Sequence, residues 1–384
     1  MKRTAWAFAL GCCLLPCALL AAPAAAQPGV GSFADVPGGK LWYETCGSGA
    51  KTMVLLHDGV LHSVTWDDVW PALCKSFRVV RYDRRGYGRS PEAKAPYSPV
   101  EDVAAVMKAA GMEHAVIVGA STGGGIAIDF TLAHPKQVDG LLVVGPEVSG
   151  LAHTGHMLSR MGELQAKLAQ GDAAGAIQGS WLLSPGDDAN AQRLIKLFGA
   201  YPQDMNHQDP ATPSPPAGPR LSEIKVPTLV LIGEDDVADN QAEAGVVEYA
   251  IHGAHREVIR KAGHLVYMEQ PVEFVAAVAR FADTPVGPSP GTEPALRRLI
   301  EQMRQGTTDY DRMNPSMAKI ARGQAEPVKR LLATLGAVRS VTYDSRGVAG
   351  ADIFVVAFDQ GRMEWRLKLG QGGRIDLLSA KPLP

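Results

Sequence analysis

The chain has 384 residues, 46% of them hydrophobic, and a formal net charge of −2 at pH 7. This length and composition predict a globular protein with one large core and a smaller second one, and exclude a low-complexity chain. The charge is uneven, about −10 for residues 27–294 and +6 for residues 295–384. The basic charges are dispersed along the second region, which argues against nucleic acid as a partner.

Residues 1–26 have the pattern of an export signal peptide. Lys2 and Arg3 precede an apolar stretch, and Ala24-Ala25-Ala26 supplies the small residues that a signal peptidase accepts. We therefore expect a periplasmic or secreted bacterial protein. A lipid or membrane anchor is the alternative, although Pro16 directly before Cys17 fits lipid attachment poorly. No later stretch is long and apolar enough to span a bilayer, so no stable membrane insertion is expected after cleavage.

Three of the five cysteines lie within residues 1–26, which leaves Cys46 and Cys74 in an oxidising compartment. They are either one disulfide or two separate buried thiols, because the sequence does not supply the distance between them. No Cys/His cluster has the spacing of a structural zinc site, and the H-x-x-H of His252 and His255 alone is a weak signal. The sequence therefore predicts no metal.

Strand-like apolar runs alternate with helical patterns between Leu41 and Asp283, as in a mostly parallel sheet covered by helices on both faces. The predicted strands are Leu41–Glu44, Met53–His57, Arg78–Asp83, Ala115–Val118, Gly140–Val144, Thr228–Ile232 and Arg256–Ile259. Together with the domain boundaries below, this pattern predicts an α/β domain over residues 27–283.

The alternation lapses between Val144 and Thr228. Helical patterns over 157–170, 173–183 and 189–198 are followed by a proline-rich stretch, 202–219. We interpret residues 147–222 as a helical cap inserted over the working edge of the sheet. Five large side chains are candidates to line its underside or to pack within the cap: Met157, Leu158, Met161, Trp181 and Phe198.

Residues 284–294 are rich in proline and glycine and are predicted to be a linker. Residues 295–384 are predicted to form a small α+β domain, with helices around 296–303 and 328–335 and strands at 340–343, 352–358, 363–369 and 374–378. Alternation within 363–369 predicts that Glu364, Arg366 and Lys368 face solvent. The opposite charges of the two domains favour their docking.

The most informative motif is Gly-Ala-Ser-Thr-Gly at residues 119–123, between a predicted strand and a predicted helix. This is the G-x-S-x-G nucleophile elbow, in which a strained turn lifts Ser121 above the sheet edge. A serine hydroxyl is a weak nucleophile at its ordinary pKa and needs a base, which in turn needs an orienting acid. The strand at 228–232 leads into Gly-Glu-Asp-Asp at 233–236, and His264 follows the last strand, so a carboxylate and the imidazole are expected at the same sheet edge as Ser121.

Residues 30–283 resemble the α/β-hydrolase fold superfamily. Residues 82–90, Tyr-Asp-Arg-Arg-Gly-Tyr-Gly-Arg-Ser, and the Ser-Thr-Gly-Gly-Gly that begins at Ser121 are similar to its cofactor-free haloperoxidase/arylesterase branch. The resemblance implies that Ser121 is the nucleophile, His264 the general base and then acid, and Asp236 the residue that orients the imidazole, with no cofactor. The family pattern Gly-Glu-x-Asp favours Asp236 over its neighbours Asp235 and Asp239.

The resemblance also implies an oxyanion hole formed by the backbone N–H groups of Thr122 and Gly59. Two residues depart from the family pattern, Asp58 where glycine is usual and Ala120 where histidine is common. A carboxylate about 5 Å from the oxyanion would oppose catalysis by roughly 3 kcal/mol at an effective dielectric near 20. We therefore expect Asp58 to point away from the hole or to bind a cationic group.

The expected function is hydrolysis of small-molecule carboxylic esters or lactones through an acyl-enzyme. A carbon–carbon bond hydrolase with the same triad and a non-catalytic binding protein on the same scaffold are the alternatives. The basic tail resembles C-terminal modules appended to exported serine hydrolases. Among the other polar residues, Asp83, Arg84 and Arg85 are expected to brace loops, His57 and His62 are undecided, and His153 and His156 are expected on the surface.

Overall fold

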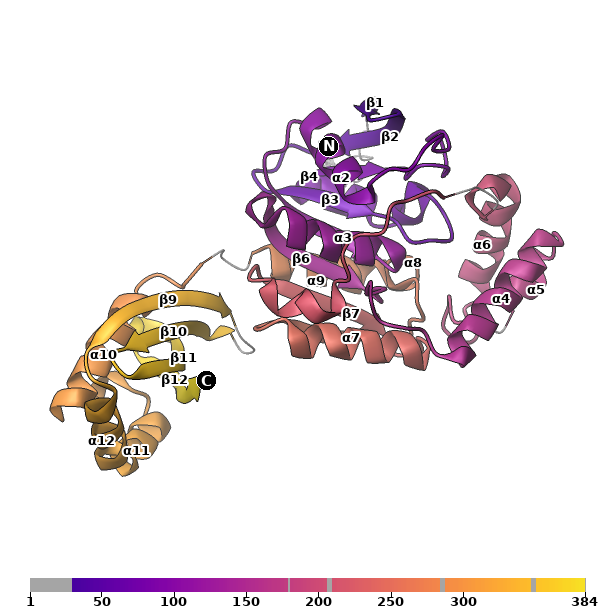
Figure 1. Cartoon of the computed structure of the whole chain (residues 1–384). Coiled ribbons are helices and arrows are strands. Elements are labelled where there is room, and N and C mark those ends of the chain that lie inside the picture. The colour runs from indigo at the N-terminus through magenta and orange to yellow at the C-terminus, as the bar shows by residue number, and fades with distance from the viewer. Residues whose placement is uncertain (1–29, 179, 206–208, 284–286, 347–349, 384) are drawn as a thin grey trace, which may run out of the picture.

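The computed structural model describes residues 30–383 except 179, 206–208, 284–286 and 347–349. The predicted signal peptide, residues 1–26, lies outside the described residues, as does the start of the predicted linker. Most of the chain folds into a large sheet and the helices that flank it. A second, smaller sheet with its own helices follows near the C-terminus (Figure 1).

The large sheet has eight strands in the order β1-β2-β4-β3-β5-β6-β7-β8. Its members are β1 (Val30–Val36), β2 (Gly39–Cys46), β3 (Thr52–Leu56), β4 (Arg78–Tyr82), β5 (Ala115–Ala120), β6 (Val138–Val144), β7 (Thr228–Gly233) and β8 (His255–Ile259). From β4 to β8 all neighbours are parallel, while β1 and β2 are antiparallel. The predicted mostly parallel sheet is confirmed, and β1 is an additional strand that the sequence did not predict.

Helices cover both faces of this sheet, as predicted. The helices of this part of the chain are α1 (Trp70–Ser76), α2 (Pro99–Ala109), α3 (Thr122–Ala133), α7 (Ala238–Ala250), α8 (Val266–Glu269) and α9 (Pro271–Ala282). Buried residues of α2, α3 and α7 join one core, and those of α1, α8 and α9 join the other. Because the buried strands are apolar toward both faces, each face supplies one wall of a core.

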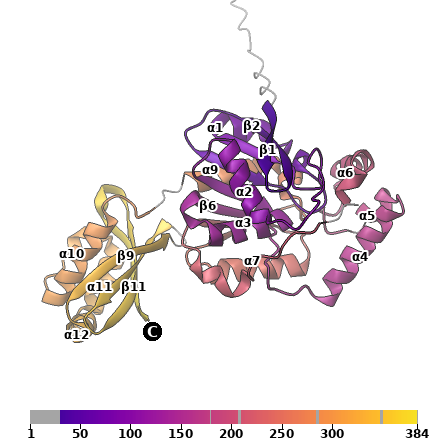
Figure 2. The same ribbon diagram turned by 45° about the horizontal axis from the view of Figure 1, so that its top comes forward.

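The predicted cap is present as α4 (Gly155–Ala169), α5 (Ala173–Ile177) and α6 (Asp188–Ala200). Each helix begins at a capping side chain, Thr154, Asp172 or Asp187, that accepts a first-turn backbone N–H. Both views show these helices to one side of the sheet (Figure 2). Three of the five candidates for its underside, Met157, Trp181 and Phe198, are buried and Met161 is partly buried, but Leu158 is 56% exposed on the outer face.

The C-terminal region folds as predicted into helices followed by an antiparallel sheet, with one additional helix. The elements are α10 (Thr292–Gln305), α11 (Pro315–Gly323), α12 (Ala325–Leu335), β9 (Val338–Arg346), β10 (Asp352–Phe358), β11 (Gly361–Leu369) and β12 (Ile375–Leu383), with sheet order β12-β11-β10-β9. The sequence did not predict α11. A separate core, which includes Leu296, Phe354 and Trp365, lies between these helices and the sheet.

One face of the small sheet contacts the first part of the chain. His252 lies against Asp344, and its Nε2 is 3.0 Å from the Glu364 carboxylate, while Lys225 Nζ is 3.3 Å from Asp344. Glu364 is only 4% exposed, so the prediction that it faces solvent was wrong. Strand alternation distinguishes the two faces of a sheet but does not reveal what covers the polar face.

Cys46 at the end of β2 and Cys74 in α1 form a disulfide, with 5.3 Å between their Cα atoms. Of the two arrangements that the sequence left open, one disulfide or two separate buried thiols, the structure has the disulfide. The bond closes a loop of 28 residues that contains β3 and the segment after it, and it therefore restrains the chain on both sides of Asp58 and Gly59.

Candidate active site

Ser121 lies in a strained turn between β5 and α3. Its φ is 51° and its ψ is −122°, and it is one of only two non-glycine residues with positive φ in the described parts of the chain. A Cβ at Gly123 would lie 2.3 Å from the His57 carbonyl oxygen, so this side of the turn accepts only glycine. Backbone strain of this kind costs on the order of 1–3 kcal/mol and clusters at functional sites.

Asp236 and His264 meet beyond the carboxyl ends of β7 and β8. His264 Nδ1 is 2.8 Å from Asp236 Oδ2, and the two residues are 6% and 8% exposed. Burial disfavours the imidazolium, but the adjacent Asp236 carboxylate outweighs it and raises the pKa of His264 above its ordinary value. The carboxylate therefore fixes one ring nitrogen as a donor and leaves the other available.

Gly145, just after β6, places this pair beside Ser121. A Cβ at Gly145 would lie 2.9 Å from His264 Nδ1 and 3.1 Å from Asp236 Oδ2. The preceding residue, Val144, accepts a hydrogen bond from the Ser121 backbone N–H at 2.9 Å. Three segments that are distant in sequence thus converge at one edge of the sheet, where open α/β sheets bind ligands.

The two predicted oxyanion donors belong to neighbouring backbones. A Cβ at Gly59 would lie 2.7 Å from Thr122 Oγ1, so the loop after β3 approaches the first turn of α3. The N–H of Thr122 is among the first in α3, where helical N–H groups have no partner within the helix. Tyr87 donates from its hydroxyl to the Gly59 carbonyl oxygen at 3.0 Å, which holds that loop.

Asp58 is fully engaged by neutral donors. Its Oδ1 accepts the backbone N–H groups of Val60 and Leu61 at 2.7 and 3.0 Å, and its Oδ2 accepts the hydroxyl of Tyr267 at 2.6 Å. Burial and the Asp58 carboxylate together raise the pKa of Tyr267 well above its ordinary value, so the phenol stays protonated as a donor. Asp58 is therefore bound by a phenol and two amides. Of the two expected arrangements, the one with a cationic group on this carboxylate is not found in the described part of the chain.

Below the site, His57 and Arg84 tie the loop after β3 to the loop after β4. His57 Nδ1 donates to the Asp58 carbonyl oxygen at 2.8 Å, and His57 Nε2 accepts the Arg84 backbone N–H at 2.9 Å. Complete burial lowers the pKa of His57 well below its ordinary value, so the ring is neutral, as this pairing requires. His57, undecided from the sequence, is therefore a structural brace.

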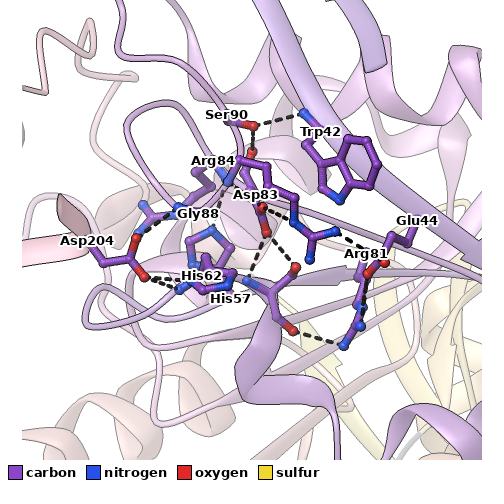
Figure 3. Close-up of polar contacts among 12 residues, drawn as sticks. Trp42, Glu44, His57, His62, Arg81, Asp83, Arg84, Gly88, Ser90 and Asp204 are labelled. Atoms are coloured by element: carbon purple, nitrogen blue, oxygen red, sulfur yellow. Dashed lines mark hydrogen bonds and ion pairs between the residues drawn. The ribbon is translucent and has the colours of Figure 1, made fainter. Parts of the chain in front are cut away.

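Asp83, Arg84 and Arg85 also brace loops, as expected, and Figure 3 shows the first two. Asp83 accepts the backbone N–H and hydroxyl of Ser63 at 3.1 and 2.5 Å. The Arg85 guanidinium binds Asp102 through two hydrogen bonds of 2.8 Å, a geometry with both strength and directional specificity.

His62 anchors the cap region to the core. The backbone N–H and Nδ1 of His62 donate to Asp204 Oδ2 at 3.0 and 2.7 Å, and the Gly88 N–H donates to Asp204 Oδ1 at 2.8 Å (Figure 3). Asp204 lies within Pro202–Met205, a short 3-10 helix that follows α6, and is 1% exposed. Nothing local in the sequence indicated this pairing, which spans 142 residues.

Asn240 is a site residue that sequence reasoning missed. Its side-chain nitrogen donates to Asp236 Oδ1 at 2.7 Å and is 3.0 Å from His264 Nδ1. Asn240 lies one helical turn after Asp236, at the start of α7, and this i, i+4 spacing was the available signal. The amide therefore holds the second oxygen of the carboxylate and lies beside the imidazole nitrogen.

No group of three or more potential metal ligands is found within the described ranges. Nor does any described helix combine the length and the apolar character needed to cross a bilayer. The groups that meet at the sheet edge are the alcohol of Ser121, the imidazole of His264 and the carboxylate of Asp236.

Comparison with known proteins finds a matching family and several similar proteins. Residues 53–278 match the Alpha/beta hydrolase family. The chain is 28% identical over 253 residues to a pimeloyl-[acyl-carrier protein] methyl ester esterase of Edwardsiella ictaluri, covering 63% of this chain and 97% of that protein. It is 26% identical over 274 residues to a 2-hydroxy-6-oxononadienedioate/2-hydroxy-6-oxononatrienedioate hydrolase of Paraburkholderia xenovorans, covering 63% and 90%.

Among solved structures, Est816, described as an N-acyl homoserine lactone degrading enzyme, superposes with a TM-score of 0.54 and 29% identity. The match covers 65% of this chain and 100% of Est816. The matched family region ends before α10 begins.

Proposed function

Since this chain belongs to the Alpha/beta hydrolase family, we propose that it is a serine hydrolase that cleaves carboxylic esters or lactones through an acyl-enzyme. In this proposal Ser121 is the nucleophile, His264 the general base and Asp236 the orienting acid. Similar proteins include esterases and a lactone-degrading enzyme, which supports an ester-cleaving hydrolase. The observation that carries the proposal is the 2.8 Å contact between His264 and Asp236 beside the strained Ser121 turn.

In the first half-reaction, Ser121 Oγ attacks the substrate carbonyl carbon while His264 Nε2 takes the hydroxyl proton. The negative charge that develops on the carbonyl oxygen is stabilised by the N–H groups of Gly59 and Thr122, each typically worth about 3 kcal/mol of barrier. The tetrahedral adduct then collapses, the imidazolium protonates the departing alkoxide, and the acyl group remains on Ser121.

In the second half-reaction, His264 deprotonates a water that attacks the acyl carbonyl. Collapse of the second adduct returns the proton to Ser121 and releases the carboxylic acid. Throughout, Asp236 accepts the Nδ1–H of His264 and stabilises the imidazolium that forms in each step. Because only neutral His264 is a base, and its pKa is raised, activity falls at low pH with an acid limb above the ordinary range of histidine.

The test is release of p-nitrophenol from acetate, butyrate and octanoate esters. We expect turnover by the wild-type protein, loss of turnover in Ser121→Ala, and normal turnover in Ser159→Ala, which changes an exposed serine of α4. A fluorophosphonate should label only proteins that retain Ser121. Asp236→Asn should slow turnover by several orders of magnitude and move the acid limb to lower pH. Undiminished turnover in Ser121→Ala would refute the mechanism.

A carbon–carbon bond hydrolase is the second candidate, because the similar Paraburkholderia xenovorans protein is named as a hydrolase of an oxo-dienedioate. The same three groups would act on a diketone. A 2-hydroxy-6-oxo-dienedioate substrate, compared with the p-nitrophenyl esters, separates the two. Failure of every substrate, with no fluorophosphonate labelling, would instead favour a binding protein on this scaffold.

We also propose that the chain is exported, that residues 27–283, 284–294 and 295–384 are the catalytic domain, linker and C-terminal domain, and that the last docks on the first. The 1–26 pattern and the Cys46–Cys74 disulfide support export. The contacts of His252 and Lys225 with Asp344 support docking. N-terminal sequencing of the periplasmic protein tests the cleavage, and limited proteolysis of the His252→Ala variant tests the docking.

A further inference from the structure

A cavity lies within the C-terminal region, and all of its lining residues fall between Met303 and Ala380. Its volume is about 330 Å³, at the small end of the ~300–1,000 Å³ range of small-molecule sites. Helices α11 and α12 form one side, and strands β11 and β12 form the other. None of the residues proposed for catalysis contributes to it.

The wall of this cavity is mostly apolar. Six of its large apolar side chains come from both helices and the sheet: Met317, Ile320, Val328, Leu331, Leu332 and Met363. Ile320 and Leu331 are 61% and 40% exposed, whereas other apolar residues of the same helices pack into the core of the C-terminal region. An apolar occupant would remove this surface from water, which is favourable.

The indole ring of Trp365 also lines the cavity. The residue is 2% exposed, and its indole N–H has no hydrogen-bond partner among the described residues. Other buried indoles, such as Trp66, share this property. Because the indole nitrogen is not accessible from the cavity, Trp365 contributes its ring to the apolar wall and no donor to a ligand.

Lys329 supplies the charge. Its side chain lines the cavity, and its ammonium lies 2.9 Å from the position that a Cβ would take on Gly306, at the end of α10. No ion pair of Lys329 is found in the described part of the chain. Glu326 also lines the cavity and is the one opposing charge, but residues 295–384 as a whole carry a net charge of +6. A cation beside an apolar wall fits a carboxylate with a hydrocarbon tail.

We propose that this cavity binds a medium-chain fatty acid. The hydrocarbon tail lies against Met317, Val328 and Leu332, and the carboxylate binds the Lys329 ammonium. A charge-assisted contact to the ammonium distinguishes the acid from an alcohol or ester with the same tail. Binding here requires no turnover, so it does not depend on the function proposed for Ser121.

The test is calorimetric titration of the full-length Ser121→Ala protein with sodium octanoate and decanoate, and with 1-octanol as the neutral match. We expect saturable binding of one acid per chain and at least tenfold weaker binding of octanol. Lys329→Met should weaken octanoate binding about tenfold, whereas Lys319→Met, an exposed lysine of α11 outside the cavity, should leave it unchanged. Glu326→Gln should leave binding equal or make it tighter.

Val328→Trp should fill the cavity and abolish octanoate binding, and an unchanged far-ultraviolet circular dichroism spectrum would show that the fold is retained. Octanoate binding that survives both Val328→Trp and Lys329→Met belongs to another site and overturns the proposal. So does equal affinity for octanol and octanoate, since the cavity then recognises no carboxylate. Absence of any binding at millimolar octanoate overturns it as well.

Discussion

Glu269, at the end of α8, links the loop that carries His264 to the cap region. Its two carboxyl oxygens accept the backbone N–H groups of Gly263 and Ser184 at 2.7 and 2.6 Å. Burial is the largest influence and raises the pKa of Glu269 from 4.5 to about 7, even though the two N–H groups favour the carboxylate. Substitution by glutamine removes the titration while keeping the size of the side chain.

The sign of the effect follows from this raised pKa. Between pH 4.5 and pH 7 the folded protein keeps the proton on Glu269 while the unfolded chain loses it, so the free energy of unfolding decreases as pH rises. The full shift corresponds to about 3 kcal/mol at 1.36 kcal/mol per pK unit, and solvent screening of a carboxyl that is not fully sealed reduces this to about 2 kcal/mol.

The assay is urea unfolding, followed by circular dichroism at pH 5 and pH 8.5, of wild type and Glu269→Gln. All other titrating groups are common to both proteins and cancel in the difference. We expect wild type to lose about 2 kcal/mol more stability than the variant over this interval. Glu273→Gln, an exposed change in α9, serves as the control and should behave as wild type. Parallel pH dependence of wild type and Glu269→Gln would refute the reasoning.

Three further changes test particular contacts. Replacing Cys46 and Cys74 by serine opens a loop of 28 residues and should lower the free energy of unfolding by about 3–4 kcal/mol in urea titrations, and a loss below about 1 kcal/mol would contradict this. Asp204→Asn replaces a carboxylate that accepts three N–H donors and weakens the contact between the cap and the core. The KM for p-nitrophenyl butyrate should therefore rise about tenfold, with a smaller change in kcat. An unchanged KM would show that this contact does not position the cap. Gly145→Ala puts a methyl group against the imidazole of His264 and should reduce kcat at least about 100-fold. The control Gly162→Ala, whose added methyl group has nothing within 4 Å, should leave kcat unchanged. Equal kcat values for the two variants would show that the imidazole lies elsewhere during turnover.

The sequence by itself predicted the parts of the protein that local patterns encode. Alternating apolar runs predicted the parallel sheet, and strand–glycine–helix spacing placed Ser121 in a sharp turn, as its φ of 51° shows. The order of the strands also predicted a carboxylate within 234–236 and His264 at one edge, and the family resemblance selected Asp236, which lies 2.8 Å from His264. These features depend on neighbouring residues, because the periodicity of a strand or helix and the backbone of a turn are set within a few positions.

Tertiary structure decided the partners of the buried polar groups. Asp58 accepts the hydroxyl of Tyr267 across 209 residues, and Asp204 accepts from His62 across 142. Glu364 occupies a polar position in its strand but is buried against His252. From the sequence alone, an acidic residue indicates only that its charge must contact either solvent or a partner group. Which of the two it obtains, and from where, depends on packing between segments that no local pattern connects.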